Sequence, residues 1–195
     1  SAYEAAHTAN PSSESVLKVF VAKRRLGGTT DLLDEWLEDN PEDDKIRIVK
    51  ATNDAATGNA ENAIGEYEKV LQRAPDNIVV LNNLAYIFDE RGDSRAMEFA
   101  KRAYELAPAR SEVMDTYGWI LLRAGNKQQG LNMLTRAAEG APNNRDIAYH
   151  LAFALHESGN DVGALEKLGT ILDDGVEFQL RADAAKLMSR LKSGR

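Results

Sequence analysis

Residues 81–108 have the sequence LNNLAYIFDERGDSRAMEFAKRAYELAP, and their pattern predicts the local structure from which the chain is built. Its first half places Leu81, Leu84 and Phe88 at the three- and four-residue spacing of one helix face. A turn containing Gly92 follows, and glycine is favoured where a helix ends in the left-handed conformation. The second half repeats small residues at helical spacing until Pro108, which cannot continue a helix. The stretch therefore predicts two helices joined by a glycine turn.

The same pattern recurs along the chain with a period of 33 or 34 residues. The turn glycines are Gly58, Gly92, Gly125 and Gly159. Small residues recur in the first helix (Ala51, Ala85, Gly118, Ala152) and in the second (Ala63, Ala96, Gly130, Ala164), and prolines close three units (Pro75, Pro108, Pro142). Since several residue types keep one period, the chain is built from repeats whose helices cross closely at the small residues.

The repeat resembles the tetratricopeptide (TPR) motif. Residues 81–108 match it as Leu81-x2-Leu84-Ala85-x2-Phe88, then Ala96-x3-Ala100, then Pro108. The next two units match in the same register, and a poorer copy has Lys50 and Asp54 where apolar residues are expected. The resemblance implies an all-α fold: a right-handed α-α superhelical solenoid of TPR helix pairs, about five units plus a C-terminal capping helix.

The repeat register also predicts the domain organisation. Residues 1–176 are expected to form the solenoid, with a helix pair over 15–40 that turns at Gly27-Gly28. Residues 1–10 look like a second helix without its first, so we expect the solenoid to begin in mid-repeat and to belong to a longer chain. Residues 177–195 are expected to form a capping helix of the same domain, with a polar outer face.

Composition excludes several classes of function. The 195 residues contain no cysteine and three histidines, and the net charge is −7. Cysteine-based catalysis and thiolate-bound metals are therefore excluded, and the negative charge argues against nucleic acid as a partner. No apolar run is long enough for membrane insertion by this segment. His150 and His156 are expected to be surface or groove residues, and the sequence predicts no catalytic residue, cofactor or metal site.

Aromatic residues mark a candidate binding surface. The residue directly after the small residue of the first helix is Tyr86, Trp119 or Phe153 in three consecutive units. The resemblance implies that these first helices line a concave groove, where such rings would anchor a protein or peptide, with polysaccharide as another ligand class. The other candidate groove residues are Asn83, Tyr149 and His156. The alternative is that each ring packs on its neighbouring unit and closes the groove.

A finer resemblance comes from Leu33-Asp34-Glu35-Trp36-Leu37 and Asp115-Thr116-Tyr117-Gly118-Trp119. These phrases are similar to the C-terminal repeats of bacterial TPR lipoproteins that accompany exosortase-type sorting and exopolysaccharide production. The resemblance implies a non-catalytic scaffold of the cell envelope, on the periplasmic side or associated with the outer membrane. The alternative is an accessory TPR region of an enzyme, a glycosyltransferase or peptidase, whose catalytic domain lies outside this chain. A third interpretation is that the repeats mainly mediate self-association.

Overall fold

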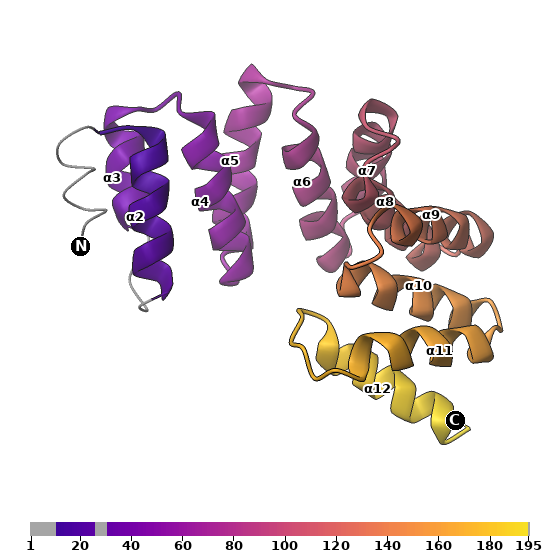
Figure 1. Cartoon of the computed structure of the whole chain (residues 1–195). Helices are drawn as coiled ribbons and strands as arrows, with labels where there is room; N and C mark the ends of the chain where they lie inside the picture. The colour runs from indigo at the N-terminus through magenta and orange to yellow at the C-terminus, as the bar shows by residue number, and fades with distance from the viewer. Residues whose placement is uncertain (1–10, 26–30, 195) are drawn as a thin grey trace. The chain divides into compact units, whose positions relative to one another are not determined.

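The computed structural model describes residues 11–25 and 31–194, which form α-helices and contain no strand (Figure 1). The helices are α2 (Ser13–Arg25), α3 (Asp31–Asp39), α4 (Asp44–Ala56), α5 (Ala60–Arg73), α6 (Ile78–Glu90), α7 (Arg95–Leu106), α8 (Ser111–Arg123), α9 (Lys127–Gly140), α10 (Arg145–Glu157), α11 (Asp161–Leu172) and α12 (Arg181–Lys192). The all-helical fold is confirmed. The helix predicted over 1–10 and the turn at Gly27-Gly28 lie outside the described residues.

Glycine turns join the two helices of the four pairs from α4–α5 to α10–α11, as the repeat predicted. Gly58, Gly92, Gly125 and Gly159 have φ angles of +86°, +68°, +87° and +84°, which L side chains rarely adopt. After α8, the Asn126 amide donates to the Leu121 carbonyl at 2.9 Å and the Gly125 amide to the Leu122 carbonyl at 3.0 Å. These two bonds are those of a Schellman motif, which satisfies carbonyls at the end of the helix.

The chain divides into two compact units, residues 1–87 and 88–195, and each is described by itself. In the first unit, α2, α3 and α4 share an apolar core made of Val16, Phe20, Leu33, Leu37 and Ile46. The poorer repeat copy differs from its neighbours because an ion pair replaces apolar contacts. Lys50 Nζ lies 2.9 Å from the Asp54 carboxylate, and these side chains are only 12% and 9% exposed.

In the second unit, two glycines let α8 and α9 approach closely. A Cβ atom on Gly118 would lie 2.8 Å from Met133 Cβ, and one on Gly130 would lie 2.8 Å from the Gly118 carbonyl oxygen. Both distances are shorter than ordinary van der Waals contact. The small residues of this repeat therefore serve close helix crossing, as their positions predicted.

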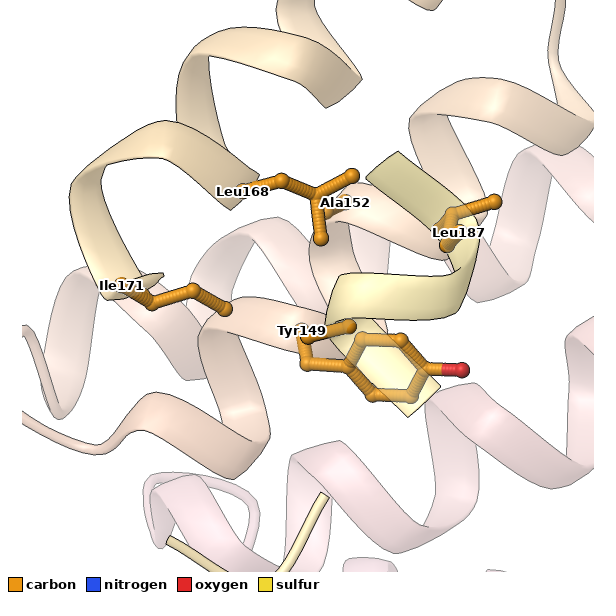
Figure 2. Close-up of a cluster of buried hydrophobic side chains, with 6 residues drawn as sticks. Tyr149, Ala152, Leu168, Ile171 and Leu187 are labelled. Carbon is orange, nitrogen blue, oxygen red and sulfur yellow. The ribbon is translucent and has the colours of Figure 1, made fainter. Parts of the chain in front are cut away.

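The last helix closes a separate apolar cluster. Figure 2 shows Tyr149, Ala152, Leu168, Ile171 and Leu187 converging from α10, α11 and α12. The helix within the predicted capping segment is α12, which begins at Arg181. Just before it, the Leu180 amide donates to the Asp146 carboxylate at 2.9 Å, which attaches the start of α12 to α10.

Candidate partner-binding site on α8 and α10

Trp119 and Phe153 lie side by side on α8 and α10, the first helices of consecutive repeats. Their ring centroids are 5.2 Å apart in an edge-to-face arrangement, which aromatic pairs favour. Both rings pack against a buried cluster that includes Leu122 and Leu151, and both keep part of their surface exposed. The structure thus brings together two of the three aromatic residues that the repeat register singled out.

His150 adds a third ring to this pair. Its imidazole stacks on the Trp119 indole, with 4.3 Å between ring centroids and 28° between planes. Its Nδ1 atom lies 2.9 and 3.0 Å from the two carboxylate oxygens of Asp115. Because both contacts constrain the ring, the orientation of Nε2 is fixed as well. We call Asp115, Trp119, His150 and Phe153 the α8–α10 cluster.

Asp115 and His150 were missing from the candidate site residues, although the sequence contains a signal for them. Asp115 stands three residues before Gly118, and His150 stands two residues before Ala152. These small residues occupy the same position in adjacent repeats, so the register places the acid and the imidazole on neighbouring first helices. The positions before the small residue therefore contribute to this site as much as the position after it.

Tyr149 and His156 lie on α10 but differ in their surroundings. Tyr149 was expected to line the groove, but the structure places it in the buried cluster of α10, α11 and α12, where it is 7% exposed (Figure 2). Tyr149 is buried because α12 packs on this side of α10. This burial raises the pKa of the Tyr149 hydroxyl. His156 lies at the other end of α10, where its Nδ1 atom is 2.6 Å from the Asp161 carboxylate.

Asn83 and Tyr86 lie on α6, in the part of that helix that belongs to the first unit. Asn83 Nδ2 donates a hydrogen bond to the Tyr67 hydroxyl at 2.8 Å, and that hydroxyl is also 2.8 Å from Thr52 Oγ1. This row joins α4, α5 and α6, so Asn83 contributes to packing within the unit. Tyr86 is 43% exposed.

Ion pairs neutralise charges near the ends of the first helices. Arg123 Nη1 lies 2.6 Å from Asp89 Oδ2 and 3.3 Å from Glu90 Oε1. Burial raises the pKa of Asp89, although the nearby guanidinium acts in the opposite direction. Lys127 pairs with Glu157 at 2.9 Å. These charges are thus compensated within the protein.

An aspartate–histidine pair such as Asp115 and His150 occurs in acyl-transfer triads, where a nucleophile is hydrogen-bonded to the other ring nitrogen. His150 Nε2 has no such partner among residues 11–25 and 31–194. The same part of the chain contains no group of three or more His, Asp or Glu residues that could hold a metal ion. Likewise, none of the described helices is long and apolar enough to span a membrane.

Comparisons with known proteins agree with the repeat fold. No family model matches the chain. The TPR repeat-containing protein PA4667 of Pseudomonas aeruginosa is 28% identical over 125 residues, which are 61% of this chain and 20% of that protein. The chain therefore aligns with a fifth of the length of this relative.

Two solved structures show the same fold. The thermophilic TPR protein TTC0263 of Thermus thermophilus superimposes with a TM-score of 0.75 at 18% identity, covering 91% of this chain and all of that one. The O-GlcNAc transferase of Thermobaculum terrenum gives a TM-score of 0.63 at 24% identity, covering 67% of this chain and 26% of the enzyme. The fold is that of a TPR solenoid, and the similarities support the TPR repeat family. Proteins of this class generally act as scaffolds for protein interactions.

Proposed function

We propose that this chain is a non-catalytic scaffold that binds a peptide or helix of a partner protein at the α8–α10 cluster. The observation that carries the proposal is the α8–α10 cluster, in which three rings from adjacent repeats meet and keep part of their surface exposed. Rigid aromatic side chains give a large contact area at a small entropic cost, and they are enriched among residues that dominate binding energy.

The geometry favours a protein partner over a polysaccharide. A sugar ring binds most strongly when it stacks flat on an open aromatic face. The His150 imidazole already covers one face of the Trp119 indole, and Phe153 approaches the indole in an edge-to-face contact. The exposed part of these rings and the fixed Nε2 atom of His150 suit an apolar side chain flanked by a hydrogen-bonding group, as in a peptide.

The test compares partner binding with folding. Proteins retained on the immobilised chain are identified by mass spectrometry, and the dissociation constant of each purified candidate is measured by calorimetry. We expect Trp119→Ala/Phe153→Ala to raise the dissociation constant by at least about 30-fold, the effect of losing a binding hot spot. Phe99→Ala is the control, because it also removes a packed ring but one outside the α8–α10 cluster. Phe99 lies on the second helix α7, and its ring centroid is 5.3 Å from that of Phe88. A folded double variant with unchanged affinity would refute the proposal.

We also propose that the partner belongs to a bacterial envelope system for exopolysaccharide production or protein sorting. The support is the similarity of the phrases around Trp36 and Trp119 to envelope TPR lipoproteins. Cell fractionation of the native host tests this placement, with the protein expected in the periplasmic or outer-membrane fraction. Recovery with the cytoplasmic fraction would contradict it.

The similarity to a TPR-containing O-GlcNAc transferase supports a second candidate function. In this alternative, the chain is the accessory repeat region of a glycosyltransferase, or of a peptidase, whose catalytic domain lies elsewhere in a longer protein. Sequencing the reading frame on both sides separates the two candidates. A flanking catalytic motif supports the enzyme, whereas further repeats alone support the scaffold.

A further inference from the structure

The α8–α10 cluster presents two ring nitrogens that the protein itself leaves unbonded. Within residues 11–25 and 31–194, neither His150 Nε2 nor Trp119 Nε1 has a hydrogen-bond partner. Neither atom is sealed in the interior, because the buried side-chain atoms without a partner in this part of the chain are Arg47 Nε and Asn82 Oδ1. Both nitrogens are therefore accessible from solvent, and water satisfies them in the free protein.

Asp115 determines which role His150 Nε2 takes. A carboxylate can only accept hydrogen bonds, so the imidazole nitrogen that faces it, Nδ1, carries the proton. Both oxygens of Asp115 hold this nitrogen, at 2.9 and 3.0 Å, and the two side chains are each only 13% exposed. In a neutral imidazole one nitrogen donates and the other accepts, so Nε2 is an acceptor. Asp115 is thus a positioning residue that acts through His150.

Trp119 supplies the opposite role, because an indole N–H group is a donor only. The indole and the imidazole stack with 4.3 Å between their centroids, so the donor and the acceptor belong to two rings in direct contact. A peptide backbone carries the matching groups, a C=O acceptor at each residue and an N–H donor at each residue other than proline. An α-helix uses these groups for its own bonds except at its ends, whereas an extended segment leaves them free.

We propose that His150 Nε2 accepts a hydrogen bond from a backbone N–H of the partner and that Trp119 Nε1–H donates one to a backbone carbonyl. The partner then binds as an extended segment, with an apolar side chain against Phe153. Proline is excluded from the position that pairs with His150, because it has no N–H. This inference rests on the proposed function and narrows its partner from a peptide or helix to an extended peptide.

The two hydrogen bonds select a partner in a way that the ring contacts do not. Aromatic surface adds affinity for any apolar side chain. A peptide that lacks the N–H, in contrast, displaces water from Nε2 and leaves this acceptor without a partner. Leaving a hydrogen-bonding group unsatisfied in this way is expected to raise the dissociation constant about tenfold.

Nitrogen NMR of the free chain tests the tautomer without a partner, at about pH 8, where an ordinary histidine is neutral. Couplings to the ring protons show which nitrogen carries the proton, and His150→Phe identifies the signals of His150 among those of the three histidines. We expect the proton on Nδ1 in the wild type and a mixture of both tautomers in Asp115→Ala. A proton on Nε2 in the wild type, or a tautomer that Asp115→Ala leaves unchanged, would overturn the proposal.

Binding is tested with a displayed library of random peptides that is selected on the immobilised chain. Peptides are kept when they bind the wild type but not folded Trp119→Ala/Phe153→Ala. One such peptide is synthesised with each backbone amide methylated in turn, which removes single N–H donors, and each dissociation constant is measured by calorimetry. We expect one methylation, next to an apolar residue, to raise the dissociation constant at least about tenfold.

A double-mutant cycle connects this amide to His150. His150→Phe keeps a flat ring but has no acceptor, so the same methylation is expected to change its affinity by less than about threefold. His156→Phe is the matched control, because His156 also lies on α10 and its Nδ1 atom also pairs with a carboxylate, that of Asp161, at 2.6 Å. In this control the methylation is expected to keep its full effect. Circular dichroism verifies that each variant is folded.

Trp119→Phe tests the second hydrogen bond, since it removes the indole N–H and keeps an aromatic ring. It is expected to raise the dissociation constant of the selected peptide at least about threefold. Unchanged affinity in a folded Trp119→Phe protein would count against the bond to the carbonyl and so against the donor–acceptor pair.

The remaining outcomes separate this inference from the proposed function. If no peptide distinguishes the wild type from Trp119→Ala/Phe153→Ala, the proposed function fails and this inference fails with it. If selected peptides depend on the two rings but tolerate methylation at every amide, or lose as much affinity in His150→Phe, only this inference fails. Sensitivity at several successive amides is the pattern of a helical partner and would contradict the extended segment.

Discussion

Replacing Gly130 with alanine tests whether the close crossing of α8 and α9 limits the stability of the second unit. A Cβ atom at this position would lie 2.8 Å from the Gly118 carbonyl oxygen, 2.9 Å from Leu122 N and 3.0 Å from Leu122 Cα. All three are backbone atoms of α8, so no side-chain rotation can relieve the overlap. The helices must separate instead.

The expected size of the effect follows from two opposing terms. Ordinary contact for a Cβ atom begins at 3.4 Å, so the helices have to move apart by several tenths of an ångström. Overpacking of this kind costs about 1–3 kcal/mol. Alanine gains about 1 kcal/mol over glycine within a helix, which offsets part of this cost. We expect Gly130→Ala to lower the free energy of unfolding by up to about 2 kcal/mol.

Gly169→Ala is the control within the same unit. A Cβ atom on Gly169 would meet only Met188 Cε, at 4.0 Å, so α11 accepts alanine without overlap. Here the helical gain acts alone, and we expect stabilisation of about 0.5–1 kcal/mol. The two substitutions are chemically identical, so the opposite signs would isolate the effect of the crossing.

Urea unfolding followed by circular dichroism measures both variants, and amide hydrogen exchange locates the change in α8 and α9. Repeat proteins do not always unfold in one step, so coincident transitions from the two methods are required for a single free energy. A Gly130→Ala protein as stable as the Gly169→Ala protein would refute the close-packing argument.

Two further predictions concern the first unit. Lys50→Met should destabilise it by about 3–5 kcal/mol in urea, because Asp54 keeps a buried carboxylate without its partner, whereas Lys50→Leu/Asp54→Leu should recover the loss. A double variant as unstable as the single one would contradict this. Partial burial acts to raise the pKa of Asp43, but hydrogen bonds from the Ser13 hydroxyl, the Trp36 indole and backbone amides lower it overall. Because its folded pKa is depressed, the stabilisation by Asp43 is complete above the ordinary pKa of 3.8 and is lost as pH falls through the lowered value. Asp43→Asn should therefore lose less stability than the wild type between about pH 4 and about pH 2, measured by urea unfolding, and an equal loss would contradict the assignment.

The repeat could be predicted from the sequence because its signals are local. Leu81, Leu84, Ala85 and Phe88 were placed on one face by spacing alone, and each is 0% exposed. The turn glycines were found in the same way, since a left-handed residue at a helix end restricts the amino acid itself. Such constraints act within a few residues, and the repeat shows each of them in several copies along the chain.

The candidate site was harder to predict because it depends on how neighbouring helices are rotated. Asp115 and His150 are 35 residues apart, and only the packing of α8 beside α10 brings their polar atoms within 3.0 Å. Tyr149 is aromatic like Trp119, yet residues of α12 cover Tyr149, whereas Trp119 stays partly exposed. The sequence of α10 alone does not determine which side of this helix α12 covers.

One pair of positions shows how the repeat conserves geometry while its chemistry varies. The residue at the start of the first helix meets the residue 29 positions later, at the end of the second. In the α4–α5 pair the contact is Asp44 with Arg73, and in the α10–α11 pair it is Arg145 with Asp174, with the charges exchanged.

In the α8–α9 pair the same two positions are Ser111 and Gly140, and a Cβ atom on Gly140 would overlap Ser111 Oγ. In these three helix pairs the same spacing brings the two residues together, and each pair makes the contact with a different combination: acid with base, base with acid, or hydroxyl with glycine. A comparison of residue types would find no pattern at these positions. Structural contacts in this protein follow the period, and the side chains that occupy them distinguish one repeat from the next.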